Sequence, residues 1–237
     1  MSSNPSTANA NLDPNELLIA EFNYIAQTAF QANEDRARVS NYYFVTAGAV
    51  IGAILSAKLE AGSVQGVYFG FAGLFFILSI VGLTILLQLA RLRAAWQDSA
   101  RAMNVIKDYY IHNSKNLNLE PAFLWRTRSI PQAITQGRNV RTVSFLLAIS
   151  VLVISFGTAV ASIAYVSLAL APAFKVAIDV SSSLVIAVMS VLVGGVYTFV
   201  ELKVYEKWIV EAERKQEQRA QEHYAAYKDL LHKYPTP

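Results

Sequence analysis

Cysteine is absent from this chain of 237 residues, and charged residues are scarce. Without cysteine there is no disulfide bond, no thiolate nucleophile and no cysteine-ligated metal. Charged residues make up 16% of the chain, below the roughly 25% that is usual for soluble domains. Charge is missing altogether from four windows, residues 39–57, 61–90, 142–174 and 180–200. A bilayer core about 30 Å thick needs about 20 apolar residues per helix, so these windows predict four membrane-spanning helices.

A soluble helical protein is the alternative, and each of its long helices would need a polar stripe. Residues 69–87 (FGFAGLFFILSIVGLTILL) and 143–166 are instead apolar on all sides. The first sixteen residues are polar and lack the basic and apolar regions of a secretory signal peptide, so residues 1–13 are expected to form a disordered tail. The sequence therefore predicts an all-α, integral membrane protein.

The distribution of lysine and arginine predicts the orientation. Of the 20 basic residues, 18 lie in the N-terminal segment, in the linker 91–141 or in the tail 201–237, and only Lys58 and Lys175 lie in the two short loops between spans. Cytoplasmic segments of membrane proteins carry the excess of basic residues. Both termini and the linker are therefore expected in the cytoplasm, with the protein in the plasma (inner) membrane.

Helical extensions are expected on the cytoplasmic side. Asp13 can cap a helix with Pro14 at its first position and Glu16 three residues after the cap. An apolar stripe follows, and no glycine or proline interrupts the segment before Gly48, so this helix can continue into the first span. The predicted order is a tail (1–13), an N-terminal cytoplasmic helix (14–41), a first transmembrane hairpin (42–90), a basic linker with an interfacial helix (91–141), a second transmembrane hairpin (142–200) and a cytoplasmic C-terminal helix (201–237).

The linker combines aromatic and basic side chains. Trp125 lies beside Arg126 and Arg128, a mixture that suits the headgroup region, where rings sit at the interface and cations meet anionic lipid. These three residues are candidate interfacial anchors, and the alternative is a loop that packs its tryptophan on protein. Anionic lipid is the expected partner of the linker, and nucleic acid is not.

Glycine is the strongest packing feature of the first hairpin. Small residues four apart share a helix face and allow close helix association in lipid. Such faces could pack the hairpin on itself or join copies of the protein. The candidate helix-packing residues are Gly48, Gly52, Gly62, Gly66 and Gly70.

Hydroxyl groups are the main polar groups within the windows. The absence of charge there argues against an ion-coupled carrier or a proton relay, which usually holds ionisable groups at bilayer depth. Four hydroxyls of the third span fall close to one face. They could line a pore or bond to neighbouring helices, and they are Ser144, Ser155, Thr158 and Ser162.

Charged clusters stand at the cytoplasmic ends of the first and fourth spans. They fit an interfacial collar that fixes the depth of the span. Alternatively, several copies would bring them together as a charged ring at a pore mouth, or the two clusters would pair within one subunit. This charged collar comprises Glu34, Asp35, Arg36 and Arg38 before the first span, and Glu201 and Lys203, followed by Glu206 and Lys207, after the fourth.

Enzymatic motifs are not found. His112, His223 and His232 are isolated and have no metal-ligand spacing. The sequence has no glycine-rich phosphate loop and no nucleophile elbow. The expectation is a protein that is not an enzyme and has no catalytic, metal-binding or cofactor-binding residues.

An N-terminal helix ending in EDRARVSNYY, hairpins of spans and a long charged C-terminal helix together resemble the SLATT group of small bacterial membrane proteins. Those are paired-span proteins described as pore-forming effectors of anti-phage systems. The resemblance implies a bacterial inner-membrane protein and favours an oligomeric pore, although this chain has four predicted spans where two are typical, and it transfers no functional residues.

Two functions from different classes are compatible with the sequence. The first is a homo-oligomeric membrane pore or ion channel gated by its cytoplasmic helices. The second is a non-catalytic scaffold or accessory subunit that holds a cytoplasmic protein partner. The absence of a recognisable docking motif favours neither, and the first is preferred because the chain is otherwise self-sufficient.

Overall fold

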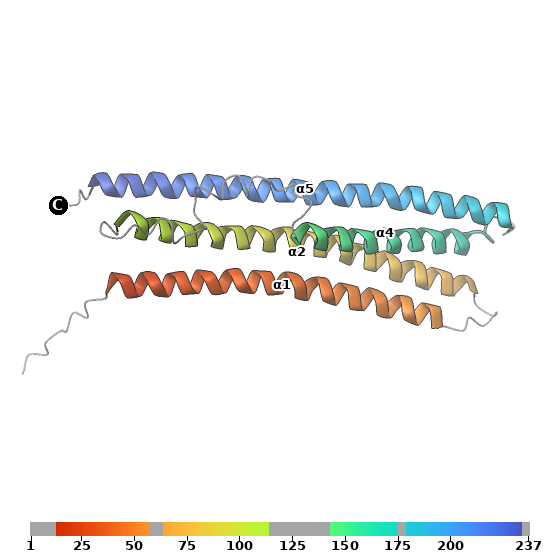
Figure 1. Cartoon of the computed structure of the whole chain (residues 1–237). Helices are drawn as coiled ribbons and strands as arrows, with labels where there is room; N and C mark the ends of the chain where they lie inside the picture. Colours follow the sequence, from red (N-terminus) through yellow and green to blue (C-terminus); the bar gives the residue numbers. More distant parts are fainter. Residues whose placement is uncertain (1–12, 57–63, 114–142, 175–178, 234–237) are drawn as a thin grey trace, which may run out of the picture. The chain divides into compact units, whose positions relative to one another are not determined.

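The chain forms long α-helices. The computed structural model describes residues 13–56, 64–113, 143–174 and 179–233, and within these ranges all regular structure is helical (Figure 1). The helices are α1 (Pro14–Ser56), α2 (Val64–Asn113), α4 (Val143–Leu170) and α5 (Val180–Lys233). The all-α prediction is confirmed for these ranges. The predicted N-terminal tail up to residue 12, Gly62 and the anchors Trp125, Arg126 and Arg128 lie outside the described residues.

Local sequence explains where α1 and α5 begin. At α1 the backbone N–H of Asn15 donates to Asp13 Oδ1 at 2.9 Å, so Asp13 caps the helix as the sequence predicts. At α5 the cap is Asp179, whose Oδ1 accepts from the backbone N–H of Ser182 at 2.8 Å. In return the Ser182 hydroxyl accepts from the Asp179 backbone N–H at 2.9 Å. These bonds satisfy amide groups that have no partner within the first helical turn.

Three of the helices are long and apolar enough to cross a membrane. They are α2, α4 and the part of α5 up to Arg219, which indicates a multi-pass membrane protein. The segment of α1 from residue 39 is not among them. Both α2 and α5 continue without a break from their apolar halves into charged extensions, and α1 is continuous from Pro14 to Ser56.

The described helices divide between two compact units. The first unit contains α1 up to Ala32 and α2 from Ala95 onward. The predicted apolar stripe of α1 is confirmed, because Leu18, Phe22 and Ile25 are partly buried and Ala29 is buried. The Lys107 ammonium lies 5.9 Å from the centre of the Phe22 ring, at the outer limit of a cation–π contact.

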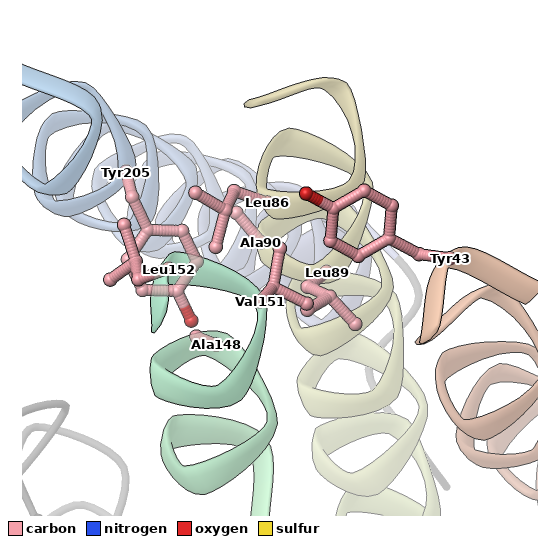
Figure 2. Close-up of a cluster of buried hydrophobic side chains, with 8 residues drawn as sticks. All are labelled: Tyr43, Leu86, Leu89, Ala90, Ala148, Val151, Leu152 and Tyr205. Atoms are coloured by element: carbon pink, nitrogen blue, oxygen red, sulfur yellow. The ribbon is translucent and has the colours of Figure 1, made fainter. Parts of the chain in front are cut away.

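The second unit comprises the rest of α1 and α2 together with α4 and α5. Its apolar core draws on all four helices, and the ring of Tyr43 extends from α1 toward α2 (Figure 2). Between apolar helices in lipid the hydrophobic effect is small, so dispersion in such close packing supplies much of the association energy. The core residues are Tyr43, Leu86, Leu89, Ala90, Ala148, Val151, Leu152 and Tyr205.

In this unit α4 packs against α2 through aromatic rings and against α5 through a close approach at a glycine. Tyr165 of α4 stacks on Phe75 of α2 with ring centres 5.8 Å apart, and it meets Phe71 edge-on at 5.4 Å. The helices α4 and α5 run antiparallel as neighbours (Figure 1). At Gly194 of α5 they approach so closely that an added Cβ would lie 2.6 Å from Val160 Cγ2.

Candidate functional site: a buried carboxylate among hydroxyl groups

Glu201 is buried inside the second unit, with 1% of its surface exposed. It stands on α5 where the apolar segment gives way to the charged extension. Its Oε1 accepts a hydrogen bond from the Ser155 hydroxyl of α4 at 2.9 Å, while Oε2 is buried and has no hydrogen-bond partner among the described residues. A buried carboxylate with one oxygen unsatisfied is costly and is characteristic of functional sites.

Tyr43 and Gly82 complete the surroundings of Ser155. A Cβ added to Gly82 of α2 would lie 2.7 Å from the Tyr43 hydroxyl and 2.9 Å from Ser155 Oγ. Glycine at this position therefore lets α1, α2 and α4 meet at one point. The Tyr43 hydroxyl donates to the Leu78 carbonyl oxygen at 3.4 Å.

Hydroxyl groups continue from this point along α2 and α4. Ser79 and Thr158 share a hydrogen bond of 2.9 Å between their hydroxyl oxygens. Tyr197 of α5 donates to the Ser79 carbonyl oxygen at 3.1 Å and is also a close neighbour of Glu201. Together with Tyr43 and Ser155 they form a hydroxyl cluster (Tyr43, Ser79, Ser155, Thr158 and Tyr197) beside one carboxylate.

This chemistry suits a proton or a small cation. A carboxylate oxygen without a hydrogen bond can take a proton or contribute one ligand to a cation, and hydroxyl oxygens can add further ligands or relay protons. In the described ranges no three histidine, aspartate or glutamate residues are placed to hold a metal ion.

Each of the four predicted pore-lining residues of α4 forms a hydrogen bond with another helix, as donor or as acceptor. Ser155 contacts Glu201, Thr158 contacts Ser79, and the Ser162 hydroxyl donates to the Ala72 carbonyl oxygen at 2.9 Å. Ser144, which is half-buried, accepts a hydrogen bond from Arg36 of α1. Within one chain these hydroxyls therefore join helices, the alternative that the sequence left open.

Four of the predicted packing glycines meet no other element in the described part of the chain. A Cβ added to Gly48, Gly52, Gly66 or Gly70 would have no atom of another element within 4 Å. The close approaches occur instead at Gly82 and Gly194. That Gly48, Gly52, Gly66 and Gly70 contact another copy of the chain stays a prediction.

The members of the charged collar differ in their surroundings. On α1, Glu34 and Arg38 are exposed, and Asp35 lies 4.0 Å from Arg38. Arg36 is buried, and this burial, followed by repulsion from Arg93, lowers its pKa. On α5, Lys203 forms an exposed ion pair with Glu206 at 2.9 Å, whereas Glu201 is enclosed. The collar residues thus fall into an exposed group and two buried charges, Arg36 and Glu201.

Several site residues were not singled out from the sequence. Tyr43, Ser79 and Tyr197 are polar members of apolar helices, and Gly82 has no glycine four residues away. The turn spacing of Ser155, Thr158 and Ser162 did indicate a shared face. Which helix that face meets depends on tertiary packing, and no local pattern encodes it.

No family model, curated protein or solved structure matches this chain.

Proposed function

We propose that the chain is one subunit of a homo-oligomeric membrane pore, an ion channel gated through its cytoplasmic helices. In each subunit four helices cross the bilayer as two hairpins, the charge-free part of α1 being the fourth span. Both termini lie in the cytoplasm of a bacterial cell, in keeping with the bias of lysine and arginine. The architectural resemblance to the SLATT group supports the same function.

The observation that carries this proposal is the position of Glu201 on an unbroken helix. Because α5 continues from its apolar segment into its charged extension, a rotation or tilt of the extension moves Glu201 against Ser155. Breaking that hydrogen bond would leave a second carboxylate oxygen unsatisfied inside the bundle. The two arrangements of this contact correspond to two states of a gate.

Large uncovered apolar faces support assembly into an oligomer. Only 11% of the apolar stretch of α5 is buried within the chain, against 33% for α2 and for α4. Gly48 and Gly52 lie one turn apart on the exposed side of α1, where another helix could approach closely. Acyl chains can cover such faces as well, so copy number is the first quantity to measure.

Native mass spectrometry of the protein extracted from membranes tests assembly. We expect a single closed homo-oligomer. Ion flux into liposomes then tests conduction, with Glu201→Gln compared with Glu206→Gln, which removes an exposed carboxylate from the same helix. We expect Glu201→Gln to change the flux several-fold and Glu206→Gln to leave it unchanged. A monomer whose liposomes leak no more than empty vesicles would refute the proposal.

A scaffold is the second candidate, favoured by exposed apolar side chains in the first unit. Leu17 and Tyr24 of α1 are both exposed and lie seven residues apart on one helix face, and Ile19 and Phe30 are also exposed. A contiguous exposed apolar patch often marks a docking surface. A partner bound there would co-purify with the wild type and be lost from a Leu17→Ser, Tyr24→Ser variant.

The C-terminal tail is tested separately by deleting residues 214–237. A deletion from residue 201 would also remove the buried Glu201 and Tyr205 and so disturb the core. Retention of every partner by both the serine variant and this truncation would exclude docking through α1 and through the tail.

A further inference from the structure

Two arginine side chains are buried next to each other in the second unit. Arg36 of α1 is 7% exposed and Arg93 of α2 is 8% exposed. They are close enough for their charges to repel, and Tyr205 of α5, itself buried, neighbours both. A buried guanidinium close to a second positive charge is unfavourable, so a compensating interaction is expected for Arg36.

No carboxylate provides that compensation for Arg36 among the described residues. Its Nη1 donates to the Ser144 hydroxyl and its Nη2 to Asn33 Oδ1 at 2.5 Å, and both acceptors are neutral. The neighbouring acid Asp35 lies beside Arg38 instead. The buried acid Glu201 accepts from Ser155 and is not among the groups that interact with Arg36.

Two buried donors on this face of α1 have no acceptor among the residues that the structure describes. Arg36 Nε and Ser40 Oγ are both buried without a hydrogen-bond partner in the described part of the chain. Because these residues are four apart, they lie on one helix face, one turn from each other. Ser40 is 0% exposed, so water at the molecular surface does not satisfy it.

Ser40 is exceptional among the buried serines that the structure describes. The others each donate to an oxygen, either in their own helix or in a neighbouring one; they are Ser79, Ser99, Ser155, Ser162 and Ser190. An unsatisfied hydroxyl and an unsatisfied guanidinium N–H on one helix face indicate a missing acceptor.

We propose that Arg36, Ser40 and Arg93 form a buried binding site for a small inorganic anion, with chloride as the natural occupant. A monatomic anion has no directional requirement and can accept from N–H and O–H donors alike, and its negative charge offsets the positive charge that Arg93 places near Arg36. A lipid phosphate is the less suitable occupant, because it is carried by a headgroup at the bilayer surface and these donors are enclosed by helices. The site is independent of whether the protein conducts ions.

Thermal unfolding of the full-length protein in nanodiscs of zwitterionic lipid tests the site. Chloride is titrated against gluconate at constant ionic strength, so that only specific binding changes the midpoint. We expect the wild-type midpoint to rise with chloride. Ser40→Ala should weaken the apparent affinity about tenfold or more, since a hydrogen bond to a charged group is lost.

Matched controls remove the same groups from exposed positions of α1. Ser56→Ala removes a hydroxyl that donates to carbonyl oxygens of its own helix, and Arg38→Gln removes an exposed cation, whereas Arg36→Gln removes the buried one. We expect both controls to keep the wild-type chloride response and Arg36→Gln to lose it. If Arg36→Gln does not fold, Ser40→Ala still decides the outcome.

Line broadening in the ³⁵Cl NMR spectrum of the same samples reports bound chloride directly and should follow the same order of variants. Equal midpoints in chloride and gluconate, or an unchanged response in Ser40→Ala, would overturn the proposal. Stabilisation that requires anionic lipid and ignores chloride would also overturn it and assign the site to a headgroup.

Discussion

Substituting Gly82 by alanine tests the meeting point of α1, α2 and α4. The added Cβ would lie 2.7 Å from the Tyr43 hydroxyl, 2.9 Å from Ser155 Oγ and 3.0 Å from Ser155 Cβ. The tyrosine hydroxyl ends a long side chain and can move, but Ser155 Cβ is fixed to the backbone of α4. The two helices must therefore separate by a few tenths of an ångström, and overpacking of this kind costs about 1–3 kcal/mol.

Gly73→Ala is the matched control, because an added Cβ there meets no atom within 4 Å. Both substitutions gain up to about 1 kcal/mol of helix propensity, which cancels when the two variants are compared. We expect Gly82→Ala to be less stable than Gly73→Ala by about 1–3 kcal/mol, measured by reversible unfolding in mixed detergent micelles. Adding Tyr43→Phe should recover part of the loss. Equal stabilities of the two alanine variants would show that the helices do not meet at Gly82.

Two further predictions concern hydrogen bonds at other places in the second unit. Thr158→Val removes the hydrogen bond to Ser79 and should lower the free energy of unfolding by about 0.6 kcal/mol, a typical value for a hydrogen bond between membrane helices. The control Thr84→Val removes an exposed hydroxyl bonded to its own helix and should have a smaller effect. A larger effect of Thr84→Val would contradict the contact between Thr158 and Ser79. At the start of α5, hydrogen bonds lower the pKa of Asp179; the largest effect comes from the backbone N–H of Ser182 and smaller effects come from the hydroxyls of Ser182 and Ser181. The folded state therefore favours the ionised carboxylate, and the cap contributes its full stability at neutral pH. The difference in unfolding midpoint between wild type and Asp179→Ala should therefore be constant above about pH 5 and shrink as the pH falls below the usual aspartate pKa of about 3.9; a difference that grows in acid would contradict this sign.

The helices could be predicted from the sequence because their determinants are local. Charge-free windows, the cap at Asp13 and the absence of helix-breaking residues before Gly48 require only neighbours along the chain. Continuity of α1 across the predicted membrane border follows from the same rules. The face shared by Ser155, Thr158 and Ser162 also follows, because residues three and four apart lie together on a helix.

The candidate site could not be predicted because it depends on which faces meet. Gly48 and Gly52 have the spacing of a packing motif yet face away from their own chain, whereas the isolated Gly82 provides the tight crossing. Glu201 follows the charge-free window directly, so the sequence places it with the exposed collar residues. Only the packing of α4 against α5 shows that it is buried and that Lys203, two residues later, is not.

The length of α5 has a consequence for how motion at Glu201 would be observed. From Glu201 to Lys233 the helix advances 32 residues, which at about 1.5 Å per residue gives an arm of roughly 48 Å. A tilt of about 5° around Glu201 displaces the far end by about 4 Å over that length, while atoms one turn from Glu201 move by only about a tenth as much. Such leverage makes the distal end of α5 the best place for a distance probe, because it magnifies a change too small to resolve at the carboxylate.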